Sequence, residues 1–80
     1  MIIKILGTNC PKCKQTKAIV EEVVEEHHID ATIINVADIL QIINYNVLNV
    51  PTLVINEQVT ISGRVPHKEE VLALVKEFSD

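Results

Sequence analysis

The chain has 80 residues, a formal net charge of -4 and only one Tyr and one Phe, although 48% of its residues are hydrophobic. A chain of this length has room for one hydrophobic core, so we expect a single domain. Its acidic balance argues against nucleic acid as a partner, because phosphate binding needs a basic surface. No apolar run approaches the roughly 18 residues that span a bilayer, and no targeting signature is seen, so we expect a cytoplasmic protein without a membrane partner.

The first half of the sequence predicts a strand, a helix and a second strand. Residues 1–6 are a short, largely apolar run that ends before Gly7, which is typical of a buried strand. Pro11 suits the first turn of a helix, and apolar side chains then recur at helical spacing to about residue 28. Residues 31–36 form a second run of mainly β-branched side chains.

The second half predicts a short helix, a hairpin and a final helix. Asp38 suits the N-cap of a helix that ends near Tyr45. Residues 52–55 and 58–61 predict two strands around a tight turn, and an apolar helical pattern follows Pro66. The order β-α-β-α-β-β-α predicts an α/β fold in which a four-stranded mixed sheet is flanked by helices.

Two cysteines, Cys10 and Cys13, lie where the first helix is predicted to begin. A bridge between them closes too small a loop to stabilise a fold much, so the pair is expected to be catalytic, metal-binding or incidental. The N-terminus of a helix favours negative charge and lowers the pKa of a cysteine thiol placed there. For a thiol–disulfide exchange, Cys10 is then the expected nucleophile and Cys13 the resolving thiol.

Three lysines follow in the opening turns of the same helix, Lys12, Lys14 and Lys17. Cations near a helix N-terminus work against helix stability, so their presence beside a candidate site is a hint of function. We expect Lys12 to stabilise the Cys10 thiolate and assign smaller parts to Lys14 and Lys17. The alternative for each of them is a solvated surface position.

The motif Cys10-Pro11-Lys12-Cys13 after a strand, and Val50-Pro51-Thr52 at the start of a hairpin, resemble the thioredoxin and glutaredoxin superfamily. The likeness is closest to the small glutaredoxin-like redox-active disulfide proteins, which the segment from Gly63 to Pro66 also resembles. It extends from Met1 to the last helix and implies a minimal thioredoxin fold over residues 1–80. It further implies that Pro51 is cis and packs beside the cysteines, and that Val50 and Pro51 bind the substrate.

The same resemblance implies an enzyme, a thiol–disulfide oxidoreductase that needs no cofactor and acts as a monomer. Its partners would be a protein or small-thiol substrate that contains a disulfide, and a separate thiol reductant or disulfide reductase. The chain departs from the usual pattern in three places. Asn9 replaces the aromatic residue of typical thioredoxins, Lys12 replaces the Tyr of typical glutaredoxins, and Lys4 is the only charged residue of a first strand that holds an acid in thioredoxins.

A metal-binding domain is the alternative, because two cysteines at this spacing also bind Cu(I) or Zn. The sequence resembles the small metal chaperones less well, since these follow the order strand, helix, two strands, helix, strand. A four-ligand zinc site would have to recruit His27, His28 or His67. We expect instead that His27 is half-buried, that His28 is solvated and that His67 lies near the start of the last helix. A structural domain with inert cysteines is a further alternative.

Overall fold

A computed structural model describes residues 1–8 and 10–78. Within these residues the chain forms the strands and helices β1 (Ile2–Leu6), α1 (Pro11–Glu26), β2 (Thr32–Val36), α2 (Ile39–Asn44), β3 (Thr52–Ile55), β4 (Gln58–Ser62) and α3 (Lys68–Phe78). This order and the α/β class confirm the prediction from the sequence. Asn9, where typical thioredoxins have an aromatic residue, lies outside the described residues.

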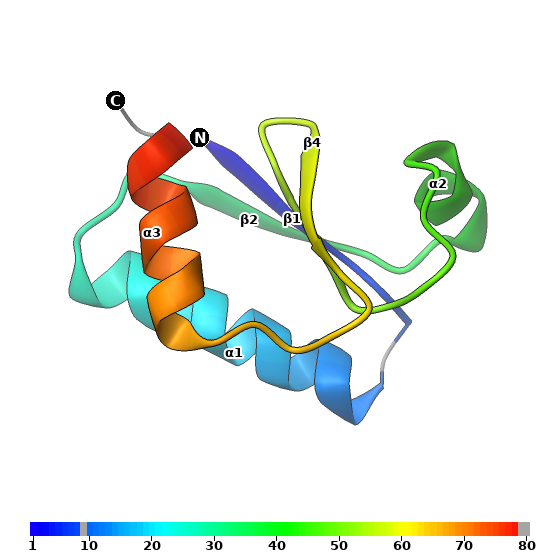
Figure 1. Cartoon of the computed structure of the whole chain (residues 1–80), viewed down its shortest axis with the longest axis horizontal. Coiled ribbons are helices and arrows are strands. Elements are labelled where there is room, and N and C mark those ends of the chain that lie inside the picture. The colour runs from blue at the N-terminus through cyan, green and yellow to red at the C-terminus, as the bar shows by residue number, and fades with distance from the viewer. Residues whose placement is uncertain (9, 79–80) are drawn as a thin grey trace.

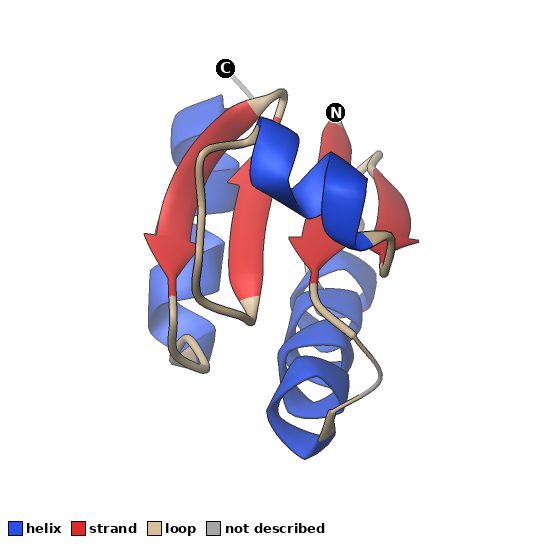
Figure 2. Cartoon of the chain, turned by 90° about the vertical axis from the view of Figure 1, so that its right-hand side faces the viewer, coloured by secondary structure: helices blue, strands red, loops and turns tan. Residues whose placement is uncertain are grey.

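The strands form one mixed sheet in the order β2-β1-β3-β4. β1 pairs in parallel with β2 and antiparallel with β3, and β3 and β4 form the predicted hairpin. Helices α1 and α3 cover one face of the sheet, and α2 lies on the other (Figures 1 and 2). β1 is therefore an inner strand, and its carboxyl end leads directly to the N-terminus of α1.

The alternation of side chains along β1 divides the core between the two faces of the sheet. Ile3 and Ile5 are fully buried in the larger cluster, toward α1 and α3, whereas Leu6 packs in a smaller cluster on the α2 side. The larger cluster contains no aromatic residue among its fully packed members, which are Ile3, Ile5, Val20, Val23, Leu53, Ile55, Ile61, Val71 and Val75. The core thus consists of branched aliphatic side chains, as the composition indicated.

The hairpin turn is the tight turn that the sequence predicted. Asn56 and Glu57 both have positive φ, 49° and 69°, as a two-residue turn of this kind requires. Positive φ is unusual for Glu, and here its carboxylate forms an ion pair with Lys4 at 2.7 Å. The Tyr45 hydroxyl also contacts both side chains. The carboxylate of Glu57 and the hydroxyl of Tyr45 raise the pKa of Lys4 above its usual value.

Helix α2 has six residues, and only Ile42 among them is buried. Asp38 caps it as predicted, because its side chain accepts a hydrogen bond of 2.9 Å from the backbone N–H of Leu40. No helix in residues 1–8 and 10–78 combines the length and the apolarity that a membrane crossing requires.

Candidate active site

Cys10 and Cys13 are joined by a disulfide at the N-terminus of α1. Cys10 is the N-cap, in extended conformation with φ -94° and ψ 159°, and Pro11 is the first helical residue. The helix therefore begins where the sequence predicted, around Cys10 to Pro11. The two cysteines differ in access, because Cys13 is 4% exposed whereas Cys10 is only partly buried.

The side chain of Cys10 takes the place that Ser, Thr or Asp usually has at a helix N-terminus. Its Sγ accepts a hydrogen bond of 3.1 Å from the backbone N–H of Cys13. The first turn of α1 contains no acidic residue. In the reduced protein, this N–H and the positive end of the helix dipole would both favour a negative charge on the Cys10 sulfur.

Gly7 lets the end of β1 approach the disulfide closely. A Cβ atom on Gly7 would lie 2.5 Å from the Sγ of Cys13 and 3.6 Å from the Cβ of Val50. The backbone N–H of Gly7 donates a hydrogen bond of 2.9 Å to the carbonyl of Val36 on β2, which fixes its place in the sheet. Any larger residue at this position would have to displace the buried sulfur.

The loop before β3 lies beside Gly7 and carries a cis peptide bond between Val50 and Pro51. Three contacts fix this loop. The N–H of Gly63 donates to the carbonyl of Pro51 at 2.9 Å, and the hydroxyl of Thr52 contacts both the carbonyl of Asn49, at 2.7 Å, and the side chain of Ser62. Pro51 is buried, whereas Val50 is 37% exposed. Among the described residues, no hydrogen bond occupies the backbone N–H or C=O of Val50.

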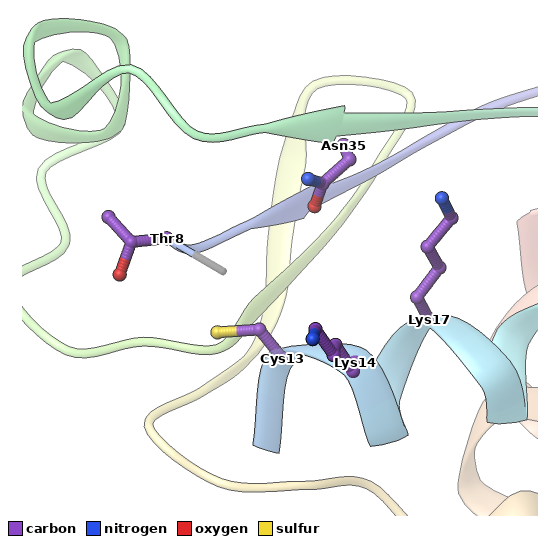
Figure 3. A pocket seen from close by; sticks show the side chains of 5 residues that line it. All are labelled: Thr8, Cys13, Lys14, Lys17 and Asn35. Carbon is purple, nitrogen blue, oxygen red and sulfur yellow. The ribbon is translucent and has the colours of Figure 1, made fainter. Parts of the chain in front are cut away.

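A polar cavity of about 210 Å³ lies on one side of Cys13 (Figure 3). It is lined by Thr8, Cys13, Lys14, Lys17 and Asn35. Lys17 extends from α1 toward β2, and Asn35 projects from β2 toward α1 (Figure 3). The register of the sheet explains this meeting, because Asn35 pairs with Ile5 and so faces the side that α1 covers.

The lysines that line this cavity are not Lys12, to which the sequence analysis gave the main part in stabilising a thiolate. Lys12 is exposed and does not line the cavity, whereas Lys14 and Lys17 do. The sequence could have indicated Lys17, since this residue follows Cys13 by four positions and so lies on the same face of α1. Asn35 was missed, because its place beside Cys13 depends on how β2 pairs with β1.

An apolar pocket of about 300 Å³ lies on the other side of Thr8. Its remaining lining comes from α2 and the loop that follows, namely Ile39, Ile42, Ile43, Val47, Leu48 and Val50. Several of these side chains are exposed to solvent, and Leu48 is 92% exposed. The sequence analysis did not identify this pocket, whose residues have no motif in common.

The histidines that a zinc site would need lie away from the cysteines in the fold. His27 is the C-cap of α1, at the end opposite to Cys10, and His28 follows it. His67 precedes α3, where its backbone N–H donates to Glu70. Among residues 1–8 and 10–78, no group of three or more His, Cys, Asp or Glu side chains could hold a metal ion.

Comparison with known proteins places this geometry in a family. Residues 1–76 match the family model described as "Thioredoxin domain". The chain is 36% identical over 78 residues to a "Thioredoxin" of Methanocaldococcus jannaschii, which covers 98% of this chain and 90% of that protein. It is 34% identical over 71 residues to a "Thioredoxin" of Methanothermobacter thermautotrophicus, which covers 89% of this chain and 92% of that protein. The chain therefore belongs to the thioredoxin domain family and is a thiol–disulfide oxidoreductase, with a Cys10–Cys13 disulfide at the start of its first helix.

Proposed function

We propose that the reduced chain transfers electrons to the disulfides of substrate molecules, with Cys10 as the attacking thiolate and Cys13 as the resolving thiol. The difference in access between the two sulfurs carries this assignment. Cys10 is partly exposed at the N-cap, where a substrate sulfur can reach it, and Cys13 is 4% exposed behind it. The hydrogen bond from the Cys13 N–H to the Cys10 Sγ supports the thiolate on Cys10.

The reaction has two steps. The Cys10 thiolate attacks one sulfur of the substrate disulfide, a mixed disulfide forms, and the other substrate sulfur leaves as a thiolate. Cys13 then loses its proton and attacks the Cys10 sulfur, so that the Cys10–Cys13 bond forms and the second substrate sulfur leaves with the electron pair. Two electrons pass from the dithiol to the substrate. A separate thiol reductant or disulfide reductase would restore the dithiol, and no bound cofactor is needed.

Val50 and Pro51 are the proposed contact points for a substrate chain. The Val50 backbone N–H and C=O have no hydrogen-bond partner among the described residues, and the contacts of Pro51 and Thr52 fix the loop that carries them. An extended substrate segment could therefore pair with Val50 through its backbone, whatever its sequence.

The apolar pocket beside Thr8 favours protein substrates over small thiols. Exposed aliphatic side chains of Ile39, Ile43 and Leu48 line this pocket together with Thr8 and Val50. Apolar surface of this kind is buried when a partner chain binds, and this stabilises a complex without demanding one particular sequence. We propose that an aliphatic or aromatic side chain near the substrate cysteine enters this pocket.

A trapping experiment tests the assignment of roles. Reduced Cys13→Ser should attack a disulfide-bonded substrate protein and remain attached through Cys10, whereas Cys10→Ser should form no such adduct. Insulin serves as a model substrate, and the adduct is read by mass. Equal trapping by the two variants would refute the assignment.

A redox titration separates this function from metal binding. Metal-free protein in defined thiol–disulfide buffers should form the Cys10–Cys13 disulfide reversibly, with a potential in the range of about -120 to -270 mV known for oxidoreductases. No reversible disulfide, together with tight retention of Zn or Cu(I), would favour the metal-binding alternative.

A further inference from the structure

The cavity beside Cys13 holds positive charge that the remainder of the protein does not neutralise. Lys4 and Lys68 form ion pairs with glutamates elsewhere in the fold. Neither the ammonium group of Lys14 nor that of Lys17 forms an ion pair or a hydrogen bond with any described residue. Both line the cavity that Cys13 borders (Figure 3).

Among the described residues, no Asp or Glu lines the same cavity, whose lining comes from two lysines, Asn35, Thr8 and Cys13. In the second step of exchange, the Cys13 thiol must lose its proton although it is almost fully buried. Burial favours the neutral thiol over the thiolate, so some nearby group has to offset this cost. The two lysines that line the same cavity as Cys13 carry positive charge that can do so through space.

We propose that Lys14 and Lys17 are positioning residues that stabilise the Cys13 thiolate and so accelerate resolution of the mixed disulfide. This inference rests on the proposed function, in which Cys13 is the resolving thiol. The Cys13 proton leaves to solvent through the open cavity, and the negative charge that remains on Sγ borders the cavity that the two lysines also line. Attack on Cys10 then transfers this charge to the departing substrate sulfur, which solvent protonates. Lys12 lies outside the cavity and takes no part in this step.

The two steps of the reaction can be followed separately with 2,2′-dipyridyl disulfide, a neutral probe that brings no charge of its own to the lysines. Attack by Cys10 releases the first thiopyridone at a rate proportional to the probe concentration. Resolution by Cys13 releases the second at a rate independent of that concentration. Stopped-flow absorbance of the reduced protein measures both rates over a range of pH.

The variants Lys14→Gln and Lys17→Gln should each slow the second phase about threefold at neutral pH, and the double variant about tenfold, because each removes a partly screened charge that acts on the thiolate across the cavity. The pH profile of the second phase should move to higher pH, and added salt should diminish the difference from wild type. Lys17→Arg retains the charge and should restore the wild-type rate.

The matched control is Lys76→Gln, which removes the same charge from the last turn of α3, at the opposite end of the molecule from the N-terminus of α1 (Figure 1). It should leave both phases unchanged. A second phase of unchanged rate and pH profile in the double variant would overturn the inference, as would equal slowing by Lys76→Gln. Loss of the first phase in wild type, or of the adduct in Cys13→Ser, would instead refute the proposed function.

Discussion

Replacement of Gly7 by Ala tests how closely the end of β1 approaches the disulfide. The added methyl group would lie 2.5 Å from the Sγ of Cys13, whereas carbon atoms in packed interiors lie about 3.5–4.0 Å from their neighbours. Gly7 and Cys13 are both buried, so about 1 Å of movement must come from well-packed elements. Overpacking of this kind lowers the free energy of unfolding by about 1–3 kcal/mol. Ala in place of Gly also reduces the conformational entropy of the unfolded chain, which raises the free energy of unfolding by about 0.4–1 kcal/mol.

We therefore expect Gly7→Ala to lower the free energy of unfolding of the oxidised protein by about 1–2 kcal/mol. The reduced protein should lose less, because the free thiol of Cys13 can rotate away from the new methyl group. If the difference is about 1 kcal/mol, the disulfide becomes easier to reduce and its potential rises by about 20 mV. Denaturant unfolding of both redox forms and a redox titration measure these quantities.

The matched control is Gly63→Ala. Gly63 has φ +82°, and a Cβ atom there would meet Asn49 at 3.2 Å and neither cysteine. This variant should be destabilised equally in both redox forms, with an unchanged potential. The reasoning would be refuted if Gly7→Ala were as stable as wild type when oxidised, or if its stability fell equally in both forms.

Three further changes test other parts of the structure. Lys12→Gln should raise the pKa of the Cys10 thiol and slow its alkylation at neutral pH about twofold, which is the usual size of effect for an exposed charge. An unchanged titration of the thiol would show that Lys12 is only a solvated surface residue. Asp38→Ala removes the cap of α2 and should lower the free energy of unfolding by about 0.5–2 kcal/mol, as measured in denaturant, whereas an unchanged stability would show that the cap is dispensable. The Arg64 guanidinium and a backbone N–H lower the pKa of Glu70 to about 2, so this contact stabilises the folded state above about pH 4.5 and is lost as the pH falls toward 2. In Glu70→Gln the decline of stability between these pH values should be shallower than in wild type, and identical acid unfolding curves would contradict this.

The elements were predictable because their signals are local. The apolar periods of β1 and α1, the cap at Asp38 and the turn at Asn56 each depend on a few neighbouring residues. Their order then restricted the fold to a mixed sheet, since a strand–helix–strand connection joins parallel strands and a hairpin joins antiparallel ones. The hand of the strand–helix–strand connection is also fixed. Val50-Pro51-Thr52 indicated nothing by itself and gained meaning from the cysteine motif, which is distant in the sequence but lies at the same end of the sheet.

The surroundings of the cysteines could not be predicted to the same degree, because they depend on pairing between distant segments. Asn35 reaches Cys13 through the register of β2 against β1, which a one-residue shift would have turned to the other face. Lys4 and Glu57 meet across β1 and the hairpin, and neither residue has a sequence signal for the other. For this reason the sequence favoured Lys12, which lies next to the cysteines in the chain, over Lys14 and Lys17, which line the cavity.

The position of β1 inside the sheet makes the cysteine side of the site more rigid than the apolar pocket that α2 lines. β1 is hydrogen-bonded to a strand on each side and carries Gly7 at its end, so we expect its amide hydrogens to exchange with solvent more slowly than most. Helix α2 buries only Ile42, so we expect its amide hydrogens to exchange faster than those of β1. If the proposed function is correct, we expect the apolar pocket to adjust to different partners while the sulfur atoms keep one geometry, so that a single reduction potential would serve substrates of different shapes.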